Sequence, residues 1–130
     1  MQLNVTTDYA VRTVLYLATK KDYASSTEIS KAMGIPHAYV LKLTKTLRDA
    51  DIISEKRGAK GGFTLKADPD QLTLLDILLK FEKTMIINKC LEKDGHCSRC
   101  AQPYCNVRKL LVKVQAQVGA ALSVKISDFL

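Results

Sequence analysis

Residues 25–50 read SSTEISKAMGIPHAYVLKLTKTLRDA, and this stretch decides the fold. Ser25 is followed three residues later by Glu28, which is the spacing of a capping box at the start of a helix. Ile29 and Met33 then supply one apolar face, and Gly34 is placed to end the helix. The pattern predicts a short helix over residues 25–34.

A second helix is expected after the turn at Ile35 and Pro36. Over residues 37–50, the apolar side chains of Val40, Leu43 and Leu47 fall on one face, and polar and basic side chains are left for the other faces. Two helices joined by a short turn that contains Gly have the spacing of a helix-turn-helix.

The residues that follow favour a β-hairpin. Two β-prone runs, residues 52–56 and 63–66, flank the basic turn Arg57-Gly-Ala-Lys-Gly-Gly62. Residues 37–66 contain seven Lys and Arg and three Asp and Glu, so their net charge is +4, which is more than half of the chain's net charge of +7. A helix fits the major groove of DNA, and a cationic hairpin can follow its backbone. The order of elements therefore predicts a winged helix-turn-helix that binds double-stranded DNA.

Candidate DNA contacts lie on both helices and on the hairpin, or wing. Ser26 and Thr27, at the start of the helix over residues 25–34, are expected to bond phosphates. Arg57, Lys60 and Gly61 belong to the wing. The residues expected to face bases are Ala38, Tyr39, Leu41 and Lys42. A small helical protein with a solvated lysine face is the alternative, and the hairpin in the order of a winged helix argues against it.

Three more helices complete a mainly helical fold class with one β-hairpin wing. Apolar residues recur at helical spacing from residue 8 to about residue 20, with side-chain oxygens for the N-cap at residues 6–8. Thr73 and Asp76 repeat the capping-box spacing ahead of a fourth helix. The last helix covers residues 106–122, and its apolar seam favours contact between two copies of the chain. The seam residues are Val107, Leu111, Val114, Val118 and Ala121.

Length and composition limit the remaining possibilities. With 130 residues, 47% hydrophobic and 25% charged, the chain fits one globular domain. We expect a DNA-binding region over residues 1–70 and a cysteine loop with a dimerisation helix over residues 71–130, packed as one compact domain. The chain shows no secretory signal and no run near the ~20 apolar residues of a membrane span, so a cytoplasmic protein without a membrane partner is expected. No catalytic constellation is found, and an enzyme is not expected.

All four cysteines, Cys90, Cys97, Cys100 and Cys105, lie in the segment before the last helix. Residues 88–104 have no apolar period, so the order of this loop must come from something other than packing. In a reducing compartment, clustered thiols bind metal or sense redox change more often than they form structural disulfides. Thiolates suit iron–sulfur clusters and zinc alike. The residues alone leave open an iron–sulfur site, a zinc-stabilised interaction module and a metal-free thiol sensor.

Several features occur together along the chain: Met1-Gln-Leu, Thr7-Asp-Tyr-Ala-Val-Arg12, the wing over residues 57–63, the cysteine loop, and the ending Ile126-Ser-Asp-Phe-Leu130. Together they resemble the Rrf2-type winged helix-turn-helix transcription regulators over essentially the whole chain. The resemblance implies a cytoplasmic homodimer in which three loop cysteines and one further residue hold an iron–sulfur cluster, [2Fe–2S] or [4Fe–4S], near the dimer helix.

The resemblance is closer to the NsrR-like branch than to the IscR-like branch. In the IscR-like branch a His follows the third cysteine by three positions, and here that position is Arg108. In NsrR-like members an Asp near the start of the first helix serves from the partner subunit, and Asp8 matches it. The resemblance therefore implies Asp8 as the fourth ligand, with Arg12 as its electrostatic neighbour. Leu41 replaces a Glu that tunes DNA sequence choice in the IscR-like branch, so a different operator is expected.

Four cysteines for three ligand positions leave the middle ligand open. Cys90 and Cys105 match the outer pair, and the length of the first gap favours Cys97 over Cys100. In the alternative all four cysteines hold the cluster within one subunit, and Asp8 is spare. The expected function is a sequence-specific repressor switched by a cluster that responds to nitric oxide, redox state or iron–sulfur supply. A metal-free thiol regulator on the same fold and a zinc-stabilised interaction module are the alternatives.

Overall fold

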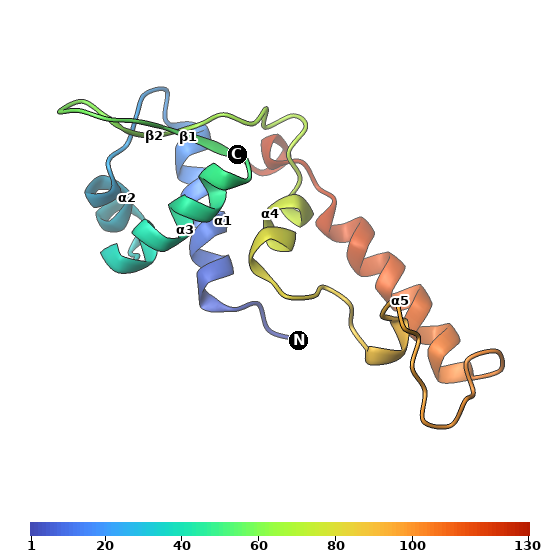
Figure 1. Ribbon diagram of the computed structural model, residues 1–130. Coiled ribbons are helices and arrows are strands. Elements are labelled where there is room, and N and C mark those ends of the chain that lie inside the picture. Colours follow the sequence, from blue (N-terminus) through green and yellow to red (C-terminus); the bar gives the residue numbers. More distant parts are fainter.

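The computed structural model describes all 130 residues and confirms a mainly helical fold with one β-hairpin (Figure 1). In chain order the elements are α1 (Val5–Thr19), α2 (Ser26–Met33), α3 (His37–Asp49), β1 (Ile53–Lys56), β2 (Gly62–Leu65), α4 (Leu74–Phe81), the 3-10 helix η1 (Lys89–Leu91), α5 (Asn106–Leu122) and the 3-10 helix η2 (Ile126–Phe129). The second and third helices, the hairpin and the last helix lie where the sequence predicts them, with strand ends shifted by one residue.

A single apolar core lies beneath α1, which packs against α2, α3, α4 and β2. Val14, Leu43 and Leu47 are fully buried in this core. Ile77 of α4 and Ile126 of η2 are buried in the same cluster, so residues from both expected regions of the chain share one core.

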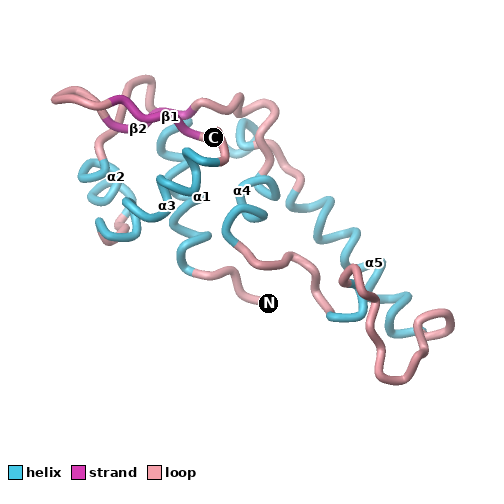
Figure 2. Tube along the Cα trace, in the orientation of Figure 1, coloured by secondary structure: helices cyan, strands magenta, loops and turns pink.

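The last helix and the cysteine loop extend from this core as an arm (Figure 2). No residue of α5 is buried. Gln115 of α5 ties the arm together, because its side-chain oxygen accepts from the Ile87 N–H at 2.8 Å and its amide donates to the Met85 carbonyl at 3.1 Å. None of the helices is both long and apolar enough to span a membrane.

The first helix begins earlier than expected. It starts at Val5 instead of residue 8, and its N-cap is Asn4, whose side chain accepts from the Thr7 N–H at 2.9 Å. Glu82, just after α4, accepts from the Asn4 N–H at 2.8 Å and from the Thr7 hydroxyl at 2.7 Å. The bonds from Thr7 and Asn4 lower the pKa of Glu82, and they fix the start of α1 to the end of α4.

The two predicted capping boxes have different outcomes. At Thr73 and Asp76 both bonds of the box are present. At α2 the Ser25 side chain accepts from the Glu28 N–H at 3.1 Å, but the Glu28 carboxylate accepts from Tyr16 at 2.5 Å and from Lys20. Glu28 therefore joins α2 to α1 and does not close the box.

The hairpin pairs Ile53 with Leu65 and Lys56 with Gly62 in an antiparallel register. Phe63 also bridges to Ala24, which holds the hairpin against the segment before α2. Gly62 has a φ of 143°, and a Cβ there would lie 2.3 Å from the Ala24 carbonyl oxygen. Only glycine allows this close approach of two backbones.

Candidate nucleic-acid interface and cysteine loop

The third helix presents a stripe of apolar and basic side chains to solvent. Ala38, Leu41, Lys42 and Lys45 are exposed, with Leu41 at 53%, and they follow the i, i+3, i+4, i+7 spacing of one helical face. The opposite face is buried in the core through Val40, Leu43, Thr44 and Leu47. A helix held in this way can enter a DNA groove. Three of the four residues expected to face bases, Ala38, Leu41 and Lys42, then point outward.

Tyr39 is the fourth of those residues, and it is half-buried. Its ring packs edge-on against Tyr9 of α1, with 5.2 Å between ring centroids. The Arg12 guanidinium lies over the Tyr9 ring, 5.2 Å from its centroid. Tyr39 thus has a packing role between α1 and α3, which was not expected from the sequence.

Ser26 and Thr27 lie in the first turn of α2, as expected. The Ser26 hydroxyl is 2.9 Å from the His37 Nε2, so the start of α2 is bonded to the start of α3. Thr27 is exposed. The bond between Ser26 and His37 fixes how the two helix starts lie relative to one another.

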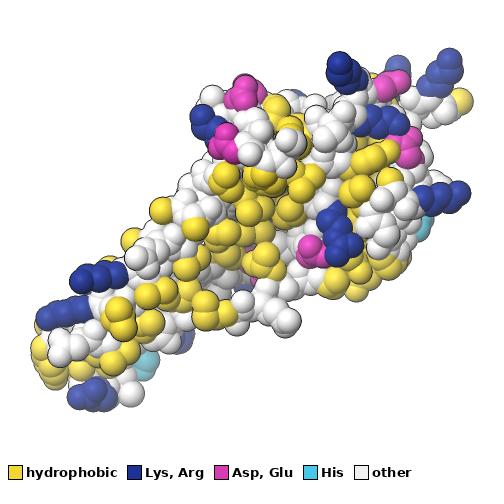
Figure 3. All heavy atoms as spheres, turned by 180° about the vertical axis from the view of Figure 1, so that it is seen from behind, with side chains coloured by type: hydrophobic (Ala, Val, Ile, Leu, Met, Phe, Trp, Pro, Cys, Tyr) yellow, Lys and Arg dark blue, Asp and Glu magenta, His cyan; other side chains and the backbone are white.

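The wing carries cations that have no acidic partner. Arg57 and Lys60 are exposed and form no ion pair, whereas Arg48 pairs with Glu55 and Lys66 pairs with Asp51 at 3.0 Å. Basic side chains stand out at the hairpin end of the molecule (Figure 3).

Gly61 has a steric reason to be glycine, apart from any DNA contact. A Cβ at Gly61 would lie 2.1 Å from the Lys56 carbonyl oxygen. The backbone conformation of the wing turn therefore requires glycine at position 61. Arg57 and Lys60 belong to the same turn.

Asp8 lies in the first turn of α1, away from the four cysteines, which belong to the arm. Its carboxylate accepts from Arg12 at 2.5 Å, and Arg12 also donates to the Met33 carbonyl at 3.3 Å, at the end of α2. Within one chain Asp8 is therefore paired to Arg12, and Arg12 connects it to the helix-turn-helix.

The four cysteines are free thiols, and no three potential metal-ligating side chains gather within one chain. Cys90, Cys97 and Cys105 are half-buried, and Cys100 is exposed. The Cys97-x-x-Cys100 segment is a turn in which the Cys100 N–H donates to the Cys97 carbonyl at 3.0 Å.

Two of the four sulfurs accept hydrogen bonds, and a third thiol, that of Cys97, has a lowered pKa. The backbone N–H groups of Ala101 and Arg99 point at Cys97 and lower the pKa of its thiol. The Cys105 sulfur caps α5 by accepting from the Arg108 backbone N–H at 3.4 Å, and the Cys90 sulfur accepts from the Asn88 amide at 3.2 Å. Such donors stabilise a thiolate, so the chemistry of this donor set fits an iron–sulfur cluster.

Arg108 contains the one buried side-chain polar atom that has no hydrogen-bond partner, its Nε. It lies in the first turn of α5 and forms no ion pair. An unpaired buried donor is costly, so the surroundings of Arg108 call for an acceptor.

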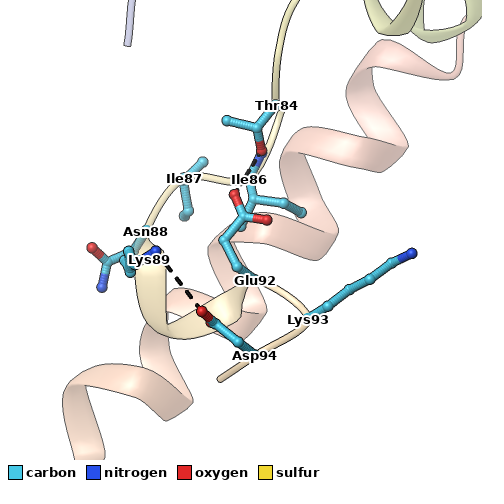
Figure 4. Close-up of a pocket in the computed structure, with 8 residues that line it drawn as sticks. All are labelled: Thr84, Ile86, Ile87, Asn88, Lys89, Glu92, Lys93 and Asp94. Carbon is cyan, nitrogen blue, oxygen red and sulfur yellow. Dashed lines mark hydrogen bonds and ion pairs between the residues drawn. The ribbon is translucent and has the colours of Figure 1, made fainter. Parts of the chain in front are cut away.

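An open hollow of about 700 Å³ lies beside η1 (Figure 4). No cysteine lines it. Across it, the Thr84 hydroxyl donates to Glu92 at 2.8 Å and Lys89 pairs with Asp94 at 3.9 Å. Glu92 and Asp94 are therefore engaged with other side chains of the loop and not with the thiols.

An apolar groove of about 370 Å³ lies where the arm meets the body. The N-terminus contributes Met1 and Leu3, and α5 contributes Val118 and Leu122. Hydrophobic side chains are also spread along the arm (Figure 3). Of the seam predicted on α5, Val107 and Ala121 are exposed and the other three residues are half-buried in a single chain.

Reasoning from the sequence missed Asn88 and Gln115, which hold the loop, and gave Arg108 no role of its own. An Asn two residues before a Cys is the one signal that could have indicated the first of these. The other two depend on how the loop folds over α5.

Comparisons with known proteins agree on one family. The family described as "Rrf2: Iron-dependent Transcriptional regulator" matches residues 3–130. A candidate HTH-type transcriptional regulator of Synechocystis sp. is 39% identical over 87 residues, which are 65% of this chain and 59% of that relative, so the match spans less than two thirds of the relative's length.

Solved structures share the fold. CymR of B. subtilis, described as the global cysteine regulator, has a TM-score of 0.80 at 23% identity, covering 98% of this chain and 95% of CymR. IscR of T. potens has a TM-score of 0.75 at 21% identity, covering 98% of this chain and 85% of IscR.

Proposed function

The chain belongs to the Rrf2 family of transcriptional regulators, which are not enzymes, and on that basis we propose that it is a homodimeric repressor of the NsrR-like kind, switched by an iron–sulfur cluster. The DNA-binding part of this proposal is supported by the winged helix-turn-helix fold. The cluster part is supported by the hydrogen bonds to the Cys90 and Cys105 sulfurs and by the lowered pKa of the Cys97 thiol. When bound, the cluster supplies a centre that is sensitive to nitric oxide, oxygen and iron shortage.

Base recognition falls to α3 and backbone recognition to α2 and the wing. Ala38 and Leu41 offer apolar contacts, which suit thymine methyl groups, and Lys42 offers a donor for guanine. Ser26 and Thr27 at the start of α2 bond phosphates, because a helix N-terminus and its hydroxyls favour anions. Additional phosphate contacts come from the unpaired cations of the wing, Arg57 and Lys60.

The proposed ligands are Cys90, Cys97 and Cys105 of one subunit and Asp8 of the other. The hydrogen bonds to the Cys90 and Cys105 sulfurs and the lowered pKa of the Cys97 thiol support these three cysteines over the exposed Cys100. Asp8 cannot complete the set within its own chain, since α1 belongs to the body and the cysteines to the arm. A dimer that packs the seam of α5 is the arrangement that brings them together.

The contacts of Asp8 explain how the cluster state reaches the DNA surface. Asp8 bonds to Arg12, and Arg12 bonds to the Met33 carbonyl at the end of α2. A ligand bond from Asp8 to the partner's cluster would fix α1 relative to the partner's arm, and Arg12 would carry that constraint to the end of α2. Two recognition helices must match half-sites about 34 Å apart, so a small rotation is enough to change affinity.

Anaerobic purification with iron, sulfide and zinc analysis tests the proposal. We expect iron and sulfide with a visible charge-transfer absorption, and loss of both in the Cys90→Ser variant. Stoichiometric zinc, or a colourless protein without iron, would contradict the cluster and favour the zinc module or the thiol regulator on the same fold.

A further inference from the structure

Arg108 has a charged side chain that lacks a hydrogen-bond acceptor. Its Nε is buried and unpartnered, and no carboxylate lies within ion-pair distance of its guanidinium. Because an arginine cannot lose its proton in a protein, this charge is present in every state of the chain.

The position of Arg108 at the N-terminus of α5 adds an unfavourable electrostatic interaction to the lack of a partner. It lies three residues after Cys105, the N-cap of α5, in a first turn that contains no acidic residue. The amide dipoles place partial positive charge at this end of the 17-residue helix, so a cation there is unfavourable unless an anion lies beside it.

The carboxylates of the arm do not supply that anion. Asp94 pairs with Lys89 at 3.9 Å, and Glu92 accepts from Thr84 at 2.8 Å. The cations without an ion pair in the loop and the start of α5 are Lys93, Arg99, Arg108 and Lys109. The region around the thiols therefore has an excess of positive charge.

We propose that Arg108 is a positioning residue for the iron–sulfur cluster, holding the thiolate of Cys105 and its neighbours by charge. This inference rests on the proposed function. The Arg108 backbone N–H already bonds to the Cys105 sulfur at 3.4 Å, and residues three apart on a helix are neighbours on its surface. A cluster held by three thiolates and a carboxylate is a net anion, which is the kind of partner that the buried Nε of Arg108 lacks.

Arg108 occupies the position at which the IscR-like branch has a ligand, and its proposed role differs from ligand binding. Arg108 cannot bind iron, since it has no lone pair to offer while protonated. Its charge instead favours the reduced, more negative form of the cluster, because net charge and hydrogen bonds at the sulfurs set the reduction potential.

The test compares Arg108→Gln with Lys109→Gln in the full-length chain. Both remove one positive charge from the first turn of α5, but Lys109 is exposed. After anaerobic loading with iron and sulfide, we expect Arg108→Gln to shift the midpoint potential to more negative values and to lose iron to a chelator several-fold faster. We expect Lys109→Gln to behave like the wild type.

A second measurement separates this role from a structural one. In the metal-free protein the Nε of Arg108 is buried without a hydrogen-bond partner and the side chain forms no ion pair, so Arg108→Gln should leave the Tm unchanged or raise it. A lowered Tm of the metal-free variant would show that Arg108 supports the fold and would overturn the inference.

Two outcomes distinguish this inference from the proposed function. If the wild type binds cluster and both variants match it in potential and in chelation rate, Arg108 has no role toward the cluster and the inference fails alone. If the wild type itself takes up no iron and sulfide under loading, the proposed function fails.

Discussion

At the residue scale, the side chains of the cysteine loop differ in how their sulfurs are surrounded. The backbone N–H groups of Ala101 and Arg99 lower the pKa of the Cys97 thiol, and Cys100, three residues later, is exposed. The choice between the two as middle ligand, which spacing leaves open, therefore has a physical basis in the fold of the turn.

We predict that Cys97→Ser abolishes cluster binding and that Cys100→Ser retains it. The N–H groups at Cys97 stabilise a thiolate there, and a thiolate is the form that binds iron. Iron and sulfide content after anaerobic loading measures the outcome. Loss of iron in Cys100→Ser at the level seen in Cys97→Ser would instead support a cluster held by all four cysteines.

Glu28 makes the contact between α1 and α2 sensitive to pH. Lys20 and then Tyr16 donate to its carboxylate and lower its pKa. A group with a lowered folded pKa stabilises the protein above its unfolded pKa, about 4.3, and this contribution is lost as the pH falls through the folded pKa.

We predict that Glu28→Gln lowers the Tm by a few degrees at pH 7, and that the difference from wild type shrinks as the pH falls below about 4. Thermal unfolding followed by circular dichroism over this range is the measurement. A Tm difference that does not change with pH would mean that the charge of Glu28 is not what joins the two helices.

At the element scale, the hairpin shows how backbone packing positions the wing. Gly62→Ala should destabilise the protein by about 2 kcal/mol or more, because the new Cβ would lie 2.3 Å from the Ala24 carbonyl oxygen. Gly58→Ala is the matched control, since its φ is 112° but no atom lies within 4 Å of a Cβ. Urea unfolding of both variants checks that Gly62→Ala lowers the free energy of unfolding more than Gly58→Ala does. Equal losses of stability in the two variants would refute the steric explanation.

The wing also makes a quantitative prediction about salt. Lys60→Ala should reduce the slope of log K against log salt by about 1, with little change in sequence preference, because we propose that Lys60 contacts a phosphate. Lys113→Ala, which removes an exposed cation from α5, is the control. Fluorescence anisotropy with labelled DNA measures both, and an unchanged slope for Lys60→Ala would remove this residue from the interface.

Elements with a local signal were predictable from the sequence. The end of α2 at Gly34, the box at Thr73 and the turn of the wing each depend on neighbouring residues, and each was found in place. The start of α1 was not predicted, because its cap at Asn4 is held by Glu82, 78 residues later in the chain. The donors around the cysteines also escaped prediction, since the direction of a backbone N–H is set by how the whole loop folds.

At the scale of the whole molecule, the arm leaves apolar side chains without full cover in a single chain. No seam residue of α5 is fully buried, and an apolar groove opens at the junction of the arm with the body. Apolar side chains left exposed or half-buried over this length are typical of a surface that a second copy covers.

We predict that Val114→Asp turns the dimer into a monomer at micromolar concentration. Val114 lies on the seam and is half-buried in the single chain, so a charge there disrupts the contact between chains more than the fold. Lys113→Asp, one residue away and exposed, is the control. Light scattering gives the mass of one chain or of two, and a dimer in Val114→Asp would place the interface elsewhere.

Coupling between the cluster and DNA affinity is the central property of the proposed regulator. The most direct measurement takes one anaerobic preparation, selects its preferred DNA from a random pool, and compares affinity for that DNA before and after iron is removed with a chelator at fixed salt. We predict tight, sequence-specific binding with the cluster and at least a tenfold loss without it. Equal affinity in both states would contradict a cluster-switched regulator and would leave a DNA-binding protein whose signal lies elsewhere.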